Sequence, residues 1–107
     1  MIAVIFEAEL REGAGDAYLD LAAELRPALE EIDGFVSIER FRSLARPERL
    51  LSLSFWRDEA AIARWRALPA HRAAQAAGRR EIFASYRLRA AEVLRDYGPA
   101  AGGDGGA

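Results

Sequence analysis

The chain has 107 residues, with fifteen basic and seventeen acidic side chains and a formal net charge of −2. This length fits one domain, and the charge balance excludes the strongly basic class of nucleic-acid-binding proteins. Cys is absent and His occurs once. Disulfides, zinc–thiolate centres and a metal site made of several histidines of one chain are therefore excluded, and no resident metal or other cofactor is expected.

Membrane association is not expected either. No apolar stretch approaches the roughly 18 residues that a membrane-spanning helix needs. Residues 1–7 are too short an apolar run for a signal peptide and have no basic start. We therefore expect a cytoplasmic protein.

The first third of the chain predicts a strand followed by a helix. Residues 2–10 begin apolar and then alternate, which is typical of a β-strand. Asp16 is expected to cap a helix whose apolar residues recur at three- and four-residue steps as far as Ile32. Pro27 lies inside this stretch and is expected to kink or divide the helix. Gly34 suits a left-handed end to it.

A hairpin and a second helical region follow. Residues 35–44 and 50–57 predict two strands, and the short turn between them favours an antiparallel hairpin. Asp58 is expected to cap the next helix. Pro69 interrupts that helix and can start a further helical segment at its first position, which is expected to close at Gly78.

The last predicted element is a strand over residues 81–95, although 89–95 could equally form a short helix. Its alternating residues, expected to share one face, are Ile82, Ala84, Tyr86 and Leu88. Residues 98–107 are rich in Gly and lack apolar anchors, so a disordered tail is expected there. The domain is thus placed at residues 1–97.

The predicted order β-α-β-β-α-β indicates an α+β, ferredoxin-like fold, a four-stranded antiparallel sheet with its helices on one face. Along residues 50–57 one face carries Leu and Phe, whereas the other carries Ser and Trp. The outward strand positions are expected to include both Phe and Trp. An apolar sheet face without helices is a binding surface, and a second copy of the chain is its simplest cover.

A family resemblance rests on the order and spacing of several short segments. These are residues 33–41 (DGFVSIERF), 54–60 (SFWRDEA), Trp65, 69–71 (PAH), Gln75, 78–79 (GR), Phe83, 86–87 (YR) and 95–97 (RDY). In these segments the chain resembles the antibiotic biosynthesis monooxygenase family of the dimeric α+β barrel superfamily. The likeness extends over about residues 1–97.

The resemblance implies a homodimer in which two sheets pack face to face into a barrel. It also implies a pocket in each subunit between sheet and helices. Characterised members of this family include cofactor-independent oxygenases of anthrone-like polyketides, quinol oxygenases and haem-degrading enzymes. Other proteins of the superfamily are isomerases or have no known reaction.

Two residues are candidates for the catalytic chemistry. Trp65 lies where relatives have a pocket Trp, and its indole could stack on a flat substrate; it could equally be a core anchor. His71 is the only side chain with an ordinary pKa near neutrality. It could take a proton from a phenol or an acidic C–H, or it could be a surface residue with a local hydrogen bond.

Three further residues are candidates for binding substrate. Gln75 lies one helical turn after His71. Arg79 could stabilise an oxyanion, and Tyr86 could orient a substrate oxygen, although a solvated Arg and a packed Tyr are the alternatives.

Two departures from the family's pattern count against its known chemistries. The haem-binding His of the haem-degrading branch would fall on Gln75. The Asn of the polyketide oxygenases would fall on Ala61, and the chain contains no Asn at all.

Three functions remain open on this basis. The first is a cofactor-independent monooxygenase that uses molecular oxygen on a small electron-rich aromatic such as a quinol or anthrone. The second is a binding or accessory protein that keeps the fold without turnover. Haem binding or degradation is the third. The expected partners are a second copy of the chain, a small aromatic molecule and dioxygen.

Overall fold

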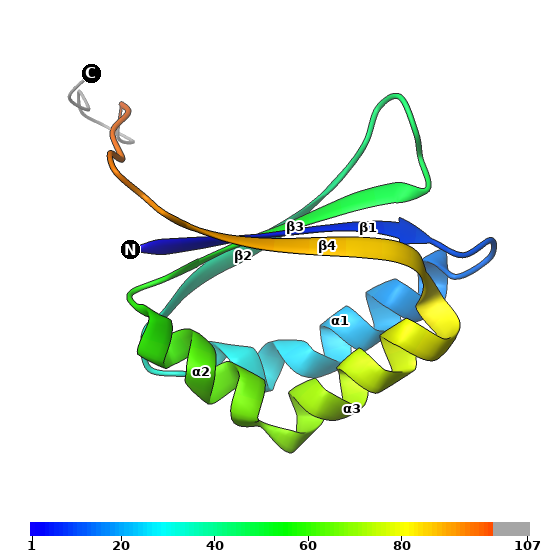
Figure 1. Ribbon diagram of the computed structural model, residues 1–107, viewed down its shortest axis with the longest axis horizontal. Coiled ribbons are helices and arrows are strands. Elements are labelled where there is room, and N and C mark those ends of the chain that lie inside the picture. The colour runs from blue at the N-terminus through cyan, green and yellow to red at the C-terminus, as the bar shows by residue number, and fades with distance from the viewer. Residues whose placement is uncertain (100–107) are drawn as a thin grey trace.

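The computed structural model describes residues 1–99 and contains one antiparallel sheet with its helices on one side (Figure 1). The elements in chain order are β1 (Ile2–Leu10), α1 (Gly15–Glu30), β2 (Phe35–Arg42), β3 (Arg49–Trp56), α2 (Glu59–Ala67), α3 (Pro69–Ala77), a turn of π-helix η1 (Gly78–Ile82) and β4 (Phe83–Glu92). The strand order is β2-β3-β1-β4 and every neighbouring pair is antiparallel. The predicted ferredoxin-like fold is confirmed.

The first helix differs from its prediction at two residues. Its N-cap is Ala14 and no side chain caps it, so the cap predicted at Asp16 is wrong; Asp16 lies within the first turn. Pro27 does not divide the helix, which continues to Glu30. The proline ring removes one backbone hydrogen bond, but Pro27 and Ala23 are exposed, so water can satisfy the carbonyl that is freed.

The entry to the last strand also differs from its prediction. Gly78 is the C-cap of α3, as predicted, but its angles are helical (φ −59°, ψ −48°). The chain therefore continues as η1, and β4 begins at Phe83 rather than at residue 81. The register with β1 shifts between Ser85 and Phe83, which leaves Ala84 as a bulge. The predicted alternation through Ile82, Ala84 and Tyr86 is therefore wrong, because Ile82 belongs to η1 and Ala84 has no partner on β1.

Beyond the bulge, β4 stays paired with β1 as far as Glu92. This settles residues 89–92 as strand rather than helix. Residues 93–99 have no regular structure, and the rest of the predicted tail, 100–107, lies outside the described residues.

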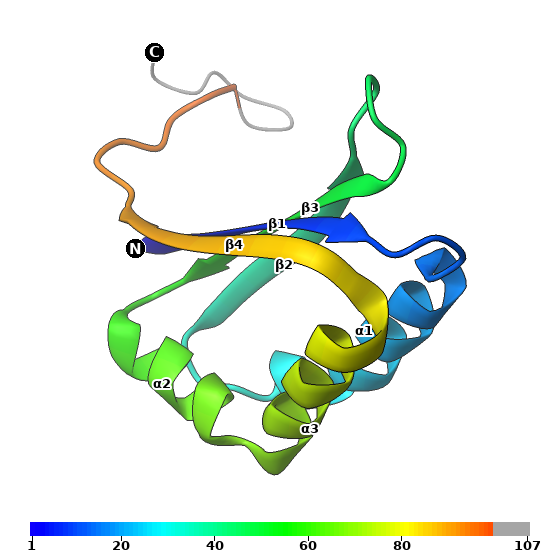
Figure 2. The same ribbon diagram turned by 45° about the vertical axis from the view of Figure 1, so that its right-hand side comes forward.

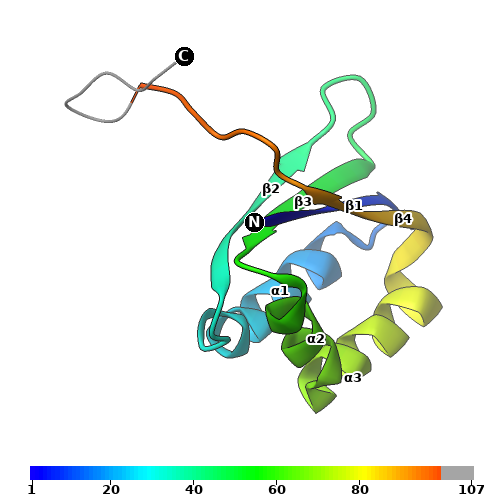
Figure 3. The same cartoon turned by 60° about the vertical axis from the view of Figure 1, so that its left-hand side comes forward.

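The two faces of the sheet have different covers. On β3 the residues that face the helices are buried (Leu50, Ser52, Ser54 and Trp56), whereas Leu51, Leu53 and Phe55 point the other way. Trp56 is only 2% exposed, so the expectation of an outward Trp is wrong. Figure 2 and Figure 3 show from two other directions that all three helices lie on the same side of the sheet. The side without helices is called the open face below.

The core between sheet and helices consists of two apolar clusters. One contains Leu10, Ala14, Tyr18, Leu50 and Ile82, and the other contains Ile2, Leu29, Trp56 and Ala61. The register places them at opposite ends of β1 and β3. Between them β3 carries two buried serines, Ser52 and Ser54. Strand β2 places Arg40 opposite Ser52 on the same face. We call Tyr18, Arg40, Ser52 and Ser54 the polar seam.

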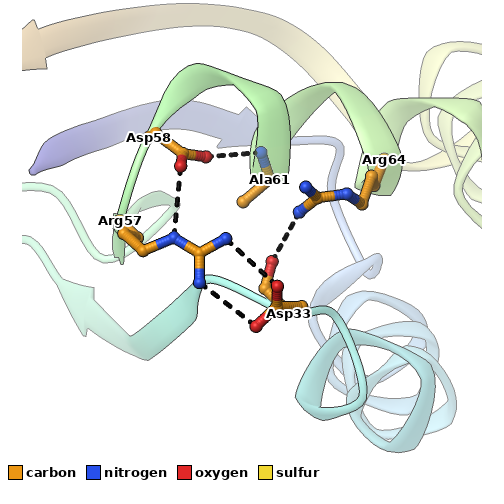
Figure 4. A network of polar contacts seen from close by, with 5 residues as sticks. All are labelled: Asp33, Arg57, Asp58, Ala61 and Arg64. Atoms are coloured by element: carbon orange, nitrogen blue, oxygen red, sulfur yellow. Dashed lines mark hydrogen bonds and ion pairs between the residues drawn. The ribbon is translucent and has the colours of Figure 1, made fainter.

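The start of α2 is fixed to the start of β2 by a close contact and a set of polar bonds (Figure 4). Arg57 Nη1 and Nη2 donate to the two carboxylate oxygens of Asp33 at 3.2 and 3.1 Å, and its Nε donates to Asp58 Oδ2 at 3.1 Å. The predicted cap at Asp58 is confirmed, because its Oδ1 accepts from the backbone N–H of Ala61 at 2.9 Å. Hydrogen bonds and charge from Arg57 lower the pKa of Asp33.

Gly34 is the narrowest point of this corner. Its φ of +96° is left-handed, as predicted, although it does not end the helix, because α1 stops at Glu30 with Glu31 as its C-cap. A Cβ at Gly34 would lie 2.7 Å from the Cβ of Ala61. Ala61 is fully buried, so the close approach of the two backbones requires a residue without a side chain.

Gly34→Ala is expected to lower the free energy of unfolding by about 2–5 kcal/mol. Left-handed backbone costs about 1–2 kcal/mol for an L-residue, and overpacking costs about 1–3 kcal/mol more. Gly13 is the matched control, since its φ is +77° and nothing lies within 4 Å of a Cβ placed there. Gly13→Ala should therefore cost only about 1–2 kcal/mol. Equal losses for the two variants in urea denaturation would show that the Gly34–Ala61 contact is unimportant.

Candidate functional site

The rings of Trp65 and His71 lie against each other where α2 turns into α3. Their centroids are 4.8 Å apart and the planes are inclined by 56°. Leu68 between the helices is extended (φ −68°, ψ 134°), and Pro69 begins α3 as predicted. The residue before a proline is held away from helical angles, so the chain turns here and brings one ring from each helix together.

Each ring of the pair is partly buried on the helix side of the sheet. Trp65 packs against the cluster that contains Trp56 and Ala61. The alternative that Trp65 is a core anchor is therefore correct for its packing, and this packing holds the indole in place beside His71.

The surroundings of the His71 imidazole favour its neutral form. Its Nδ1 is buried and has no hydrogen-bond partner among residues 1–99. Burial lowers the pKa of His71, and the positive charge of Arg66 lowers it further, while the backbone of Arg66 acts in the opposite direction. A lowered pKa favours the neutral ring at pH 7, and a neutral imidazole can accept a proton.

The other predicted site residues do not join this pair. Gln75 and Arg79 are exposed, and Tyr86 is 49% exposed. The Tyr86 ring lies on the helix side of β4, with its centroid 5.7 Å from Phe6 and 5.9 Å from Phe83. Of the five predicted residues, the structure brings Trp65 and His71 into contact with each other.

The sequence reasoning missed the polar seam. Arg40 Nε donates to the hydroxyl of Tyr18 at 3.1 Å, and its guanidinium carbon lies 5.8 Å from the centre of the Tyr18 ring. Tyr18 is only 7% exposed. The available signal was strand alternation, since Ile38 and Arg40 are two residues apart and must share a face.

A depression of about 660 Å³ lies on the other side of the sheet. Residues of all four strands line it, among them Glu7, Phe41, Arg49 and Arg87. It is therefore a feature of the open face and is separated from the Trp65–His71 pair by the sheet itself.

Metal-binding clusters and membrane-spanning helices are both absent from the described part of the chain. Residues 1–99 hold no group of three or more His, Cys, Asp or Glu side chains arranged to bind a metal ion. Within the same residues, no helix has the length and hydropathy needed to cross a membrane.

The fold agrees with that of known proteins. The family model described as antibiotic biosynthesis monooxygenase matches residues 1–77. The chain belongs to this family.

Among curated proteins, the chain is similar to "Jasmonate monooxygenase ABM" of Pyricularia oryzae. The two are 47% identical over 93 residues, which cover 87% of this chain but only 43% of the fungal protein. The chain thus spans less than half the length of that relative.

Solved structures with low sequence identity share the fold. A Deinococcus radiodurans protein described as a candidate antibiotic biosynthesis monooxygenase has a TM-score of 0.79 at 18% identity, covering 90% of this chain and 95% of its own. Rv0793 from Mycobacterium tuberculosis has a TM-score of 0.79 at 19% identity, with coverages of 89% and 96%.

The environment of His71 predicts its titration. Because the chain has one His, its Cε1 proton gives a single NMR signal, and the midpoint of its titration with pH should fall below 6.5. Arg66→Gln removes the neighbouring positive charge and should raise the midpoint; the exposed Arg72→Gln should change it less. Folding favours the neutral form, so His71 costs stability as pH falls from about 6.5 toward the lowered pKa. A midpoint at or above 6.5 would contradict the described environment.

Proposed function

We propose that this protein is a monooxygenase that uses dioxygen directly on a small ring compound, with His71 as the general base and Trp65 as the ring-binding surface. The observation that carries the proposal is the contact between the two rings, with a buried Nδ1 that has no hydrogen-bond partner among residues 1–99. A neutral imidazole beside an aromatic surface can hold a flat substrate and accept its proton.

The proposed reaction needs no external reductant when it occurs at an acidic CH2 group, as in an anthrone. His71 takes one C–H proton, and the resulting carbanion gives an electron to dioxygen. The carbon radical and superoxide combine, and a proton from His71 completes a C–OOH group. Loss of the second C–H proton with cleavage of the O–O bond yields a carbonyl and water. The substrate supplies all four electrons, and one oxygen atom remains in the product.

Tyr86, Gln75 and Arg79 are proposed to bind substrate rather than to take part in proton transfer. Tyr86 is proposed to contact substrate, because its ring lies on the helix side of β4 and is half exposed. Gln75 and Arg79 are exposed on the single chain and are proposed only for the rim of the site.

The fungal relative suggests a second substrate class. The name of that relative assigns it jasmonate, which is a cyclic ketone with a carboxylate rather than an electron-rich aromatic. A C–H next to a ketone is also acidic, so the same base could start the reaction. Quinols, anthrones and jasmonate therefore belong in one substrate panel.

The open face is proposed to bind a second copy of the chain. Its centre carries Ile5, Leu51, Leu53 and Phe55, and Phe41 beside them is 43% exposed. Charged pairs flank this apolar area, including Arg89 Nη1 with Glu7 Oε1 at 3.2 Å. An apolar centre with a polar rim is the usual anatomy of a protein–protein interface.

The oxygenase proposal predicts dioxygen consumption with at least one member of the panel, even in the presence of a metal chelator. His71→Gln should lower kcat/KM by about 100-fold or more, as expected for loss of a general base. Trp65→Ala should raise KM about 10-fold through lost ring contact. In the wild type, kcat/KM should fall on the acid side with a midpoint below 6.5, because protonated His71 cannot act as a base.

Arg72→Gln is the matched control for His71→Gln, since Arg72 is the next residue and is exposed. It should leave uptake unchanged. If every substrate binds saturably without consuming oxygen, the protein is a binding protein and the oxygenase proposal fails. Uptake that His71→Gln leaves unchanged would remove His71 from the mechanism.

The dimer proposal predicts twice the chain mass by light scattering at micromolar concentration. Leu53→Glu places a charge in the centre of the open face and should yield monomers. Leu19→Glu is the control, because Leu19 is 51% exposed on α1 and should leave the dimer intact. A monomeric wild type would contradict the proposed interface.

A further inference from the structure

We infer that Arg40 binds a carboxylate on the substrate, with Tyr18 holding the guanidinium in position. The inference rests on the proposed function only in placing the ligand between sheet and helices, since the contacts of Arg40 themselves require no turnover. It assigns a substrate class, small ring compounds that carry a carboxylate.

The burial of Arg40 sets it apart from every other Arg of the chain. All fifteen lie within residues 1–99, and fourteen of them are exposed, whereas Arg40 is partly buried. Several exposed Arg have a carboxylate partner, such as Arg26 with Glu30 and Arg57 with Asp33. Arg40 forms no salt bridge with any described residue.

A cation that is withdrawn from water without an anion is unfavourable. The cation–π contact with Tyr18 compensates this only in part. An anionic ligand would complete the site.

The hydrogen bond to Tyr18 uses Nε of Arg40 and leaves the Nη1–Nη2 edge of the guanidinium free to bind a ligand. Nε is occupied by the Tyr18 hydroxyl at 3.1 Å, while no acceptor among residues 1–99 pairs with Nη1 or Nη2. These two nitrogens form a planar fork that matches the two oxygens of a carboxylate. Because the hydroxyl accepts from Nε, its own proton remains free to donate to the same ligand.

The position of Arg40 relative to Trp65 suits one small ligand. Ile38 packs in the same cluster as Trp65, and Arg40 is two residues further along β2 on the same face, about 7 Å away along the strand. The residue opposite Arg40 is Ser52, whose small side chain leaves the guanidinium uncrowded from β3. A ring beside Trp65 and a carboxylate at Arg40 are therefore within the length of one small molecule.

The test compares acids with their neutral esters, without dioxygen. Phenylacetate and 1-naphthylacetate are titrated into the whole protein by calorimetry, and their methyl esters serve as matched neutral probes. Each acid should bind at least 10-fold more tightly than its ester. Arg40→Met should lower affinity for the acids by about 10- to 100-fold, the range for a charge-assisted pair, and leave affinity for the esters unchanged.

Two further variants separate positioning from charge. Tyr18→Phe keeps the ring but releases Nε, so it should weaken acid binding by less than Arg40→Met and leave ester binding unchanged. Arg42→Met removes the same charge from the next exposed position on this side of β2 and should change neither.

The inference is overturned by any of three results. These are failure of the wild type to bind either acid at millimolar concentration, equal losses for acid and ester in Arg40→Met, and the same loss in Arg42→Met. Binding of the acids that depends on Arg40, in a protein that consumes no dioxygen, would uphold the inference while the oxygenase proposal fails.

Discussion

Successive residues of a β-strand point to opposite faces of its sheet, and in this protein both sets contain large apolar side chains. Three helices cover only one face. On β3, Leu50 and Trp56 point to the covered face. Leu51, Leu53 and Phe55 point to the face without helices. Both faces of the sheet are therefore partly apolar. The Trp65–His71 pair lies on the helix side, and the open face is where we propose that a second copy binds. The two proposals thus place ligand and partner on opposite sides of one sheet.

The position of the Trp65–His71 pair depends on how the start of α2 is fixed against the sheet. Gly34 lets β2 begin in contact with Ala61, and Arg57 fixes the same corner from outside through Asp33. From this fixed start α2 runs for about two turns to Trp65. The extended residue before Pro69 then turns the chain and brings His71 beside the indole. The pair is therefore set by backbone constraints distant from the rings themselves.

Local rules were sufficient for much of this, because capping at Asp58 and the helix start at Pro69 depend on a few neighbouring residues. They failed where distant contacts decide. Gly78 begins a π turn that no residue propensity predicts. The ring of Phe83 packs so close to Gly78 that a Cβ placed there would lie 2.7 Å from it. The fold class followed from element order. The candidate site could be predicted only in part. Trp65 and His71 were identified from the sequence, but the role of Arg40 depends on its contact with Tyr18 of another element, which the sequence does not show.

The side of the sheet that receives the ligand is the central claim, and intermolecular NMR contacts test it directly. Isotope-filtered NOEs would be recorded between unlabelled 1-naphthylacetate and the labelled protein. The account predicts contacts from the naphthyl ring to Trp65 and from the methylene beside the carboxylate to Tyr18. Contacts to Phe41 and Leu51 would instead place the ligand in the depression of the open face and contradict the account.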